Sequence, residues 1–108
     1  MKILKLNDMT RGWFIGDFEP SIIRTQAFEV GILTHKKDEN WEEHYHKIAS
    51  EYNVLLKGKM SINGTLLNEG DIFIIEPMET ALPVFMEDCV VLCVKVPSVI
   101  GDKYLVTK

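Results

Sequence analysis

The pattern of hydrophobic and polar positions along the chain is that of short strands separated by turns. Runs rich in valine, isoleucine, leucine and phenylalanine are bounded by glycine, proline, asparagine and aspartate, which is typical of β-structure. Many short strands with frequent turns predict an all-β sandwich or small barrel. The strands we expect are KILKL (2–6), GWFIG (12–16), FEVGILTH (28–35), three runs within EYNVLLKGKMSINGTLLNEGDIFIIEP (51–77), ALPVFME (81–87) and CVVLCVKV (89–96).

The clearest single element is a hairpin over residues 59–67. Asn63-Gly64 lies between two apolar runs, and this dipeptide tolerates the positive φ angles of a tight turn. A second turn at 69–71 precedes a strand over 71–75.

The segment DENWEEHYHKIASEY (38–52) is the one part of the chain with helical character, because several good helix formers gather there. A helix would separate His44 and His46 by about 200° around its axis. An extended chain projects residues i and i+2 to the same side. We expect the extended form, in which the two histidines project together and Tyr45 points away.

Length and composition fit one folded domain. The chain has 108 residues, of which 46% are hydrophobic and 26% are charged, as in globular proteins with a single core. The formal net charge is −4 and the only arginines are Arg11 and Arg24. We expect no nucleic-acid partner, because nucleic-acid binding needs a clustered basic surface.

The N-terminus lacks the small-residue cleavage pattern of a signal peptide. No apolar run approaches the roughly 20 residues of a membrane span. Cys89 and Cys93 lie in one predicted strand, about 13 Å apart, which is too far for a disulfide. Two cysteines at this spacing are also a poor metal signature, so we expect buried free thiols, a reducing compartment, no membrane partner and a cytoplasmic location.

The candidate chemistry lies in HYHKIASEYNVLLKG (44–58). His44, Tyr45 and His46, followed after four residues by Glu51 and after six more by Gly58, resemble the first motif of the cupins, G-x5-H-x-H-x3–4-E-x6-G. The resemblance begins at the first histidine, because Asp38 stands where the motif has its leading glycine.

GDIFIIEPMETAL (70–82) resembles the second cupin motif, G-x5-P-x-G-x2-H. Gly70 is in place and the proline comes one position late, at Pro77. The final histidine, a fourth metal ligand in typical cupins, falls on Ala81 when counted from Gly70 and on Leu82 when counted from Pro77. The chain therefore lacks that ligand.

The resemblance implies a double-stranded β-helix, the jelly-roll barrel of the cupins, formed by residues 1–108 as a single domain. The motifs would occupy about 28–96, between N-terminal strands over 1–27 and a C-terminal extension over 97–108. A site in the barrel mouth and a homodimer are also implied. The two ends of the chain are similar to those of small RmlC-like cupins from sugar-nucleotide and surface-glycan pathways.

One interpretation of the site is a metal centre. Two histidines and one carboxylate with open positions suit Lewis-acid or oxygen chemistry at a transition metal. The ligands to a divalent Zn, Fe, Ni or Mn ion would be His44, His46 and Glu51. Glu79, close to the missing histidine, is a substitute fourth ligand, and His35 is a more distant candidate.

The alternative interpretation needs neither a metal nor an organic cofactor. The resemblance to sugar epimerases and ketoisomerases of the cupin superfamily implies histidine and tyrosine acting as acid and base beside a keto-sugar. Proton abstraction next to a carbonyl needs a base with a pKa near neutrality and a donor that supports the enolate. The base would be His44 or His46, and the donor Tyr52 or Lys57. Tyr45 is a weaker candidate, because alternation turns it away.

The sequence therefore predicts a cupin that binds a small molecule, a sugar or sugar nucleotide, in carbohydrate metabolism. A metal-dependent enzyme, a metal-free enzyme and a protein that binds without reaction all stay open, and for an enzyme the resemblance favours an isomerase or epimerase over a dioxygenase. Two arginines are few for clamping a diphosphate. This weakens the case for a nucleotide and leaves that for a plain sugar or sugar phosphate intact.

Overall fold

The computed structural model describes residues 1–107. Within them, no helix is long and apolar enough to cross a membrane. The elements are the 3-10 turn η1 (Leu6–Asp8) and the strands β1 (Trp13–Gly16), β2 (Ile23–Arg24), β3 (Glu29–His35), β4 (His44–Tyr45), β5 (Ser50–Lys57), β6 (Met60–Ile62), β7 (Thr65–Leu67), β8 (Ile72–Ile75), β9 (Pro83–Phe85), β10 (Cys89–Val96) and β11 (Tyr104–Leu105).

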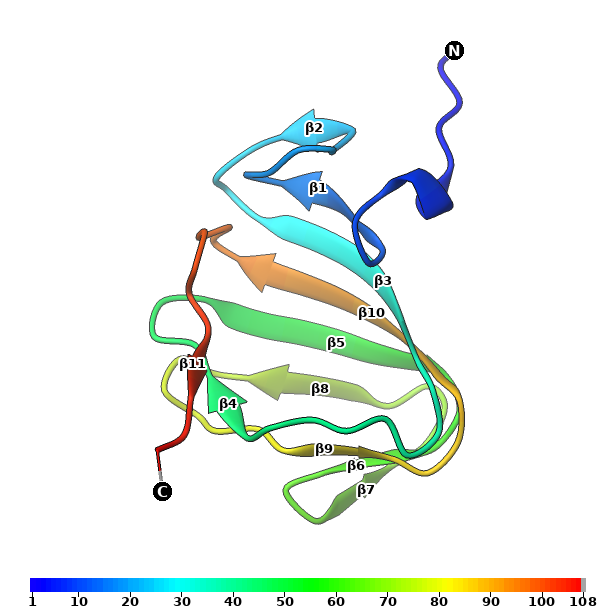
Figure 1. Cartoon of the computed structure of the whole chain (residues 1–108), viewed down its shortest axis with the longest axis vertical. Coiled ribbons are helices and arrows are strands. Elements are labelled where there is room, and N and C mark those ends of the chain that lie inside the picture. Colours follow the sequence, from blue (N-terminus) through cyan, green and yellow to red (C-terminus); the bar gives the residue numbers. More distant parts are fainter. Residues whose placement is uncertain (108) are drawn as a thin grey trace.

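The strands form two facing layers that curve toward one another as a barrel (Figure 1). One layer is a six-stranded sheet in the order β2-β1-β3-β10-β5-β8. The other contains the sheet β7-β6-β9 and the pair β11-β4, and a bridge between His44 and Ala81 joins β4 to the segment before β9. The all-β prediction is confirmed.

Most of the predicted strands are present. GWFIG, FEVGILTH and CVVLCVKV become β1, β3 and β10. The predicted hairpin is β6 and β7, joined by Asn63 and Gly64 with φ angles of 52° and 82°. Residues 38–52 contain a loop, β4 and the start of β5 instead of a helix, so the extended form is confirmed.

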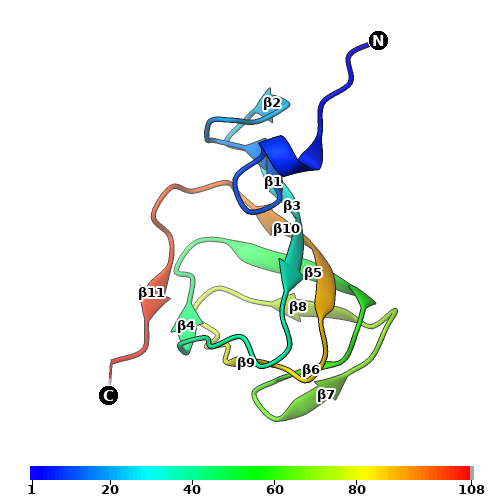
Figure 2. The ribbon, with the colours of Figure 1, turned by 45° about the vertical axis from the view of Figure 1, so that its right-hand side comes forward.

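The predicted strand KILKL (2–6) is wrong. Residues 1–5 are exposed and run away from the barrel in both views (Figures 1 and 2), and η1 follows them. An extended segment becomes a strand only when its backbone N–H and C=O groups pair with those of a neighbouring strand. The edge strand of the large sheet is β2, and residues 2–6 do not pair with it. The N-terminal strands expected over 1–27 are therefore β1 and β2.

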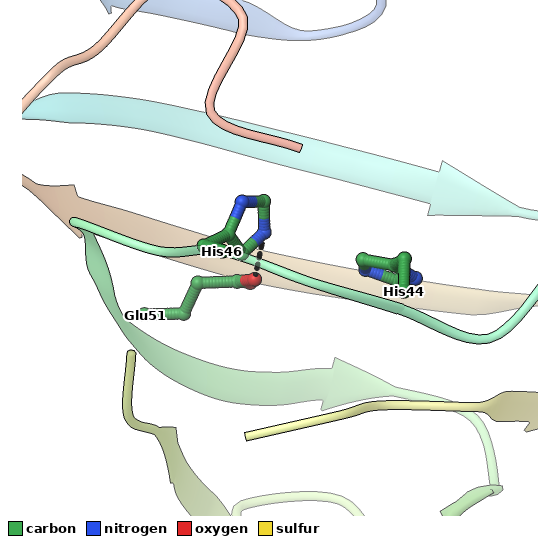
Figure 3. A group of neighbouring side chains, drawn as sticks. All are labelled: His44, His46 and Glu51. Atoms are coloured by element: carbon green, nitrogen blue, oxygen red, sulfur yellow. Dashed lines mark ion pairs between the residues drawn. The ribbon is translucent and has the colours of Figure 1, made fainter. Parts of the chain in front are cut away.

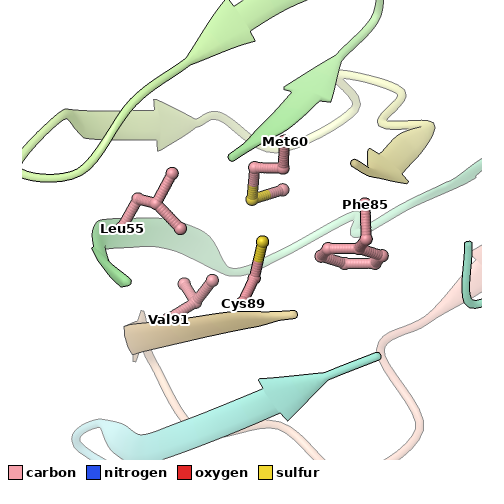
Figure 4. Close-up of a cluster of buried hydrophobic side chains, with 5 residues drawn as sticks. All are labelled: Leu55, Met60, Phe85, Cys89 and Val91. Carbon is pink, nitrogen blue, oxygen red and sulfur yellow. The ribbon is translucent and has the colours of Figure 1, made fainter. Parts of the chain in front are cut away.

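One end of the barrel is filled with apolar side chains, which leaves the other end for polar ones. The side chains of the buried cluster in Figure 4 come from strands β5, β6, β9 and β10. Both cysteines are buried free thiols, as predicted. The members of the cluster are Leu55, Met60, Phe85, Cys89 and Val91.

Gly58 closes this filled end. It follows β5 with a φ of 96°, a conformation that side chains disfavour. A Cβ atom there would lie 2.4 Å from the carbonyl oxygen of Asp88, so the turn after β5 can pass against the segment before β10 only when position 58 is glycine.

The register of the large sheet brings charged residues to the open end of the barrel. Glu29 of β3 lies opposite Lys95 of β10, and Lys95 lies opposite Glu51 of β5. Directly opposite residues share a face of the sheet. Since Cys93 and Val91, at alternate positions before Lys95, are buried in the barrel, the row Glu29, Lys95 and Glu51 also faces inward.

The C-terminal segment returns to this open end. Tyr104 lies opposite Tyr45, and Leu105 lies opposite His44, in the β11-β4 pair. Residues 97–105 thus run along the mouth of the barrel (Figure 1).

Candidate functional site

Three residues of the first motif meet inside the barrel mouth. His44 lies on β4, His46 follows it, and Glu51 is near the start of β5. One potential ligand atom from each side chain lies within 4.8 Å of the others. Nε2 of His46 is 2.8 Å from Oε2 of Glu51, and these side chains are only 5% and 13% exposed. Figure 3 shows the two side chains pointing toward each other, with His44 alongside.

Backbone carbonyl groups fix both imidazole rings. Nδ1 of His46 contacts the carbonyl oxygen of Asp102, and Nδ1 of His44 is 3.2 Å from that of Glu42. Because a carbonyl oxygen can only accept, Nδ1 is the donor in both bonds, and Nε2 of each ring is left to face the cluster. On a neutral His44 this Nε2 is a lone pair. On His46 it donates to Oε2 of Glu51, a proton that a bound metal would replace. Histidines that bind metals are commonly oriented in this way.

The ionisation of the cluster suits a cation. Burial lowers the pKa of His44 below its usual value, which favours the neutral ring. Burial alone would raise the pKa of Glu51, but the hydrogen bond from His46 and the charge of Lys95 outweigh it and leave this pKa below its usual value. Two imidazoles and an ionised carboxylate are a donor set that fits a divalent transition metal.

The second oxygen of Glu51 is also held. Sγ of Cys93 lies 3.4 Å from Oε1. Burial, with a contribution from the charge of Glu51, raises the pKa of the Cys93 thiol far above its usual value, so the sulfur stays protonated and donates. Glu51 is therefore positioned through both oxygens, by His46 and by Cys93.

Asp102 positions the segment that carries His46. Its carboxylate accepts hydrogen bonds from the backbone N–H groups of Lys47 and Ala49, both at 2.9 Å, and from that of Ile48. Burial alone would raise the pKa of Asp102, but these N–H groups outweigh it and the pKa is lowered. No local signal in the sequence marks Asp102, because its partners lie more than fifty residues earlier, and it is absent from the predicted site residues.

Lys95 and Glu29 are also absent from the predicted site residues, although the sequence carries a signal for Lys95. In CVVLCVKV the alternate positions Cys89, Val91 and Cys93 are apolar, and the next member of that series is Lys95. A lysine on the inner side of a buried strand indicates a polar site. Burial raises the pKa of Glu29, which lies opposite Lys95.

Two cavities adjoin the cluster. The outer one, of about 320 Å³, is bordered by His46, Trp13, Glu29 and Lys95 among others. The inner one, of about 90 Å³, contacts His44 and Glu51 and is otherwise mostly apolar. A small molecule has room in the outer cavity, while the inner one is nearly filled by protein.

Ala81 stands next to His44 at the place of the missing histidine. The backbones of the two residues exchange hydrogen bonds of 3.1 and 2.8 Å. The side chain of Ala81 borders the inner cavity together with His44 and Glu51. Counted from Gly70, the second motif thus has its histidine position beside His44, and in this chain the methyl group of Ala81 stands there.

The proposed donors Tyr52 and Lys57 are not brought to the cluster. Tyr52 follows Glu51 on β5, so alternation turns it to the outer face of the sheet, where it is 44% exposed. Lys57 is at the far end of β5, six residues from Glu51 and about 20 Å along the strand. Tyr45 points away as expected and stacks on Tyr104.

The additional ligand candidates are engaged with other partners, although His35 borders the inner cavity with His44 and Glu51. Glu79 is exposed, and its Oε1 accepts a hydrogen bond of 3.0 Å from the N–H of Glu76, so its carboxylate closes its own turn. Nδ1 of His35 is 2.7 Å from Glu39, and the ring stacks on Phe85. The described residues offer three ligands at this site, His44, His46 and Glu51.

No protein-family model matches the sequence, and no curated protein matches it. Solved structures do match. The chain is similar to an uncharacterized conserved protein with a double-stranded β-helix domain from Klebsiella pneumoniae, with a TM-score of 0.70, 18% identity and coverage of 99% of this chain and 93% of that one.

Two further structures extend the comparison. A cupin protein from Bacteroides fragilis matches with a TM-score of 0.55 and 25% identity, over 75% of this chain and 73% of that one. The bacterial pirin YhhW from Escherichia coli, in complex with nickel(II), matches with a TM-score of 0.65 and 19% identity, over 82% of this chain and 39% of that one. The chain has the double-stranded β-helix fold of the cupins, as the motifs predicted.

Proposed function

We propose that this protein is a cupin that holds a divalent transition metal at His44, His46 and Glu51 and binds a small molecule beside it. The observation that carries the proposal is the approach of one ligand atom from each residue to within 4.8 Å of the others. Two histidines and a carboxylate leave coordination positions open for a ligand. A bound metal would supply Lewis-acid polarisation of a ligand oxygen.

The protein's own groups prepare this site. The carbonyl groups of Asp102 and Glu42 direct Nε2 of the two histidines toward the cluster. Lys95 favours the ionised form of Glu51. The cluster is buried, so bulk water is largely kept from it. Nickel in the pirin, which has a similar fold, supports the proposal of a metal in this barrel. Two histidines and a carboxylate can bind Zn, Fe, Ni or Mn, so we propose one of these four metals.

A metal-free acid–base site is the second candidate. It is favoured by the 2.8 Å contact between Nε2 of His46 and Oε2 of Glu51, because such a pair can hold a proton and return it to a ligand. In this case the enzyme would be an isomerase or epimerase acting next to a carbonyl. Lys95 would take the place of Tyr52 and Lys57 as the donor that supports the enolate, since it borders the same cavity as His46.

For the ligand we propose a sugar or a sugar derivative. Support comes from the resemblance of the chain ends to small cupins of glycan pathways and from Trp13, whose indole borders the outer cavity and offers an apolar face for a sugar ring. Gly31 allows this placement, because a Cβ atom at that position would lie 2.7 Å from Cε3 of Trp13.

We further propose a homodimer formed through the outer face of the large sheet. The outward positions of four adjacent strands are mainly apolar, with Lys57 opposite Val90 as a charged exception, and they include Ile72 and Ile74, which are 73% and 51% exposed. A large exposed apolar surface marks an interaction site, and the same surface on two copies can pair about a two-fold axis. The face consists of Val30, Ile32, Tyr52, Val54, Ile72, Ile74, Leu92 and Val94.

We propose that residues 1–108 form one domain, of which Lys108 lies outside the described residues. The C-terminal extension belongs to that domain because Asp102 binds the segment after His46. The two buried free thiols favour a reducing compartment, the cytoplasm.

Chelation separates the two candidate functions. The purified protein is stripped with a chelator and refilled with single metals, and ligand binding and turnover of keto-sugars are followed before and after. If ligand binding or turnover is lost when the metal is stripped and recovers when it is refilled, the metal site is supported. If turnover is unchanged after complete removal of the metal, the metal site is refuted and the acid–base site is supported.

A further inference from the structure

Three cations from separate parts of the chain surround the outer cavity beside His46. Arg11 precedes β1, Lys95 is on β10, and Lys103 precedes β11, and all three border the cavity. Among residues 1–107, none of the three forms an ion pair with a carboxylate.

The two lysines are held in place by the two tryptophans. Nζ of Lys95 is 5.0 Å from the ring centroid of Trp13, and Nζ of Lys103 is 4.6 Å from that of Trp41, within the range of cation–π attraction. Burial, together with the charges of Lys95 and Arg11, lowers the pKa of Lys103. The three positive charges therefore act on one region of space.

The acidic groups around the cavity are mostly engaged elsewhere. Asp17 and Glu19 both pair with Arg24, at 3.2 and 3.4 Å. The carboxylate of Asp102 is bound by backbone N–H groups. Glu29 lies opposite Lys95 in the sheet.

Glu29 and Glu51 flank Lys95, so this lysine is partly compensated by protein. The charges of Glu51 and Glu42 also act on Lys103, but among residues 1–107 neither Arg11 nor Lys103 forms an ion pair with a carboxylate. A ligand that brings its own negative charge would complete the arrangement.

We propose that this cavity binds the carboxylate group of a small organic acid between Arg11, Lys95 and Lys103, with the rest of the ligand extending toward His46. This names the class of ligand for the proposed function and rests on it. The cavity volume of about 320 Å³ is at the lower end for small-molecule sites.

A carboxylate suits the site better than a phosphate. Phosphate groups are commonly held by helix N-termini or by bidentate arginines. The cavity offers one guanidinium group and two ammonium groups, and the part of the chain that the structure describes contains no α-helix.

The test uses the indole N–H signals of Trp13 and Trp41, the protein's two tryptophans, in NMR titrations at constant ionic strength. The probes are acetate, citrate and D-glucuronate, with D-glucose as the neutral match of D-glucuronate and inorganic phosphate as the competing anion. We expect a saturable shift with a carboxylate, and binding weakened at least about tenfold by R11Q or K103Q, since a lost charged contact is worth more than 1.4 kcal/mol. Lys59→Gln, an exposed lysine after β5, is the matched control and should leave the affinity unchanged.

Three results would overturn the carboxylate site. These are no saturable shift with any of the three acids, an equal response to D-glucose, and saturation by phosphate alone. The metal content of the same samples separates this proposal from the proposed function. If the protein binds carboxylates but takes up no metal, the anion site is supported and the proposed metal site is refuted. If it is fully loaded with metal but binds no carboxylate, the metal site is supported and the anion site is refuted.

Discussion

The backbone carbonyl of Asp102 accepts a hydrogen bond from Nδ1 of His46 across a separation of 56 residues. The carboxylate of the same aspartate binds the N–H groups of Lys47 and Ala49. One residue of the C-terminal extension thus orients a site histidine and ties down the loop that follows it. The extension is part of the site although it lies outside both sequence motifs.

Replacing Asp102 with asparagine should lower stability in a pH-dependent way. The pKa of Asp102 is lowered in the folded protein, so its contribution is present above the unfolded pKa of about 3.9 and is lost as the pH falls through the folded pKa. We expect D102N to be less stable than the original protein by about 1–3 kcal/mol at pH 7, with a smaller gap below about pH 4.

The measurement is urea unfolding of both proteins between pH 3 and pH 7. Asp8→Asn, at an exposed position in η1, is the control and should give no gap at any pH. A gap between D102N and the original protein that stays constant over the whole range would contradict the role given to the Asp102 carboxylate.

Gly58 should be far less tolerant of alanine than Gly64, although both have a positive φ. A Cβ atom at position 58 would meet the carbonyl oxygen of Asp88 at 2.4 Å, whereas position 64 has nothing within 4 Å. We expect G58A to lose about 2–4 kcal/mol and G64A about 1 kcal/mol. Equal losses in chemical unfolding would show that the contact with Asp88 has no energetic effect.

A charge on the outer face of the large sheet should separate the proposed dimer. Ile72→Glu places a carboxylate among apolar side chains that a second copy would bury, and burying an unpaired charge is costly. Ile100→Glu is the matched control, since Ile100 and Ile72 are equally exposed, at 72% and 73%, and Ile100 lies outside that face. Light scattering should give twice the mass of one chain for the original protein and for I100E, and the mass of one chain for I72E. A single-chain mass for the original protein would refute the dimer.

The parts of the fold that could be predicted depend on local pattern. The Asn63-Gly64 turn set the hairpin, and alternation within FEVGILTH and CVVLCVKV identified β3 and β10. The grouping of His44 with His46 followed from their spacing in an extended chain. KILKL has the composition of a strand, but whether a segment becomes one depends on a neighbour, and that is a property of the whole fold.

The grouping of His44, His46 and Glu51 could be predicted from the sequence, but most of the residues around this group could not. Asp102 could not be found, because its hydrogen bonds join segments that are distant in the sequence. Lys95 could have been found by following the alternation of β10 to its end. The same alternation argues against Tyr52, which must face away from its neighbour Glu51. Lys57 was misjudged in distance along the strand, and Glu79 forms its own turn.

Elemental analysis of the purified untagged protein tests whether His44, His46 and Glu51 hold a metal. The comparison is between the original protein, His46→Gln, and the control His35→Gln, whose histidine pairs with Glu39 and does not belong to the group of three potential ligands. We predict about one transition-metal ion per chain in the original protein and in H35Q, and almost none in folded H46Q. A folded original protein that holds no metal after exposure to Zn, Fe, Ni and Mn, or an H46Q variant that keeps its metal, would contradict the account.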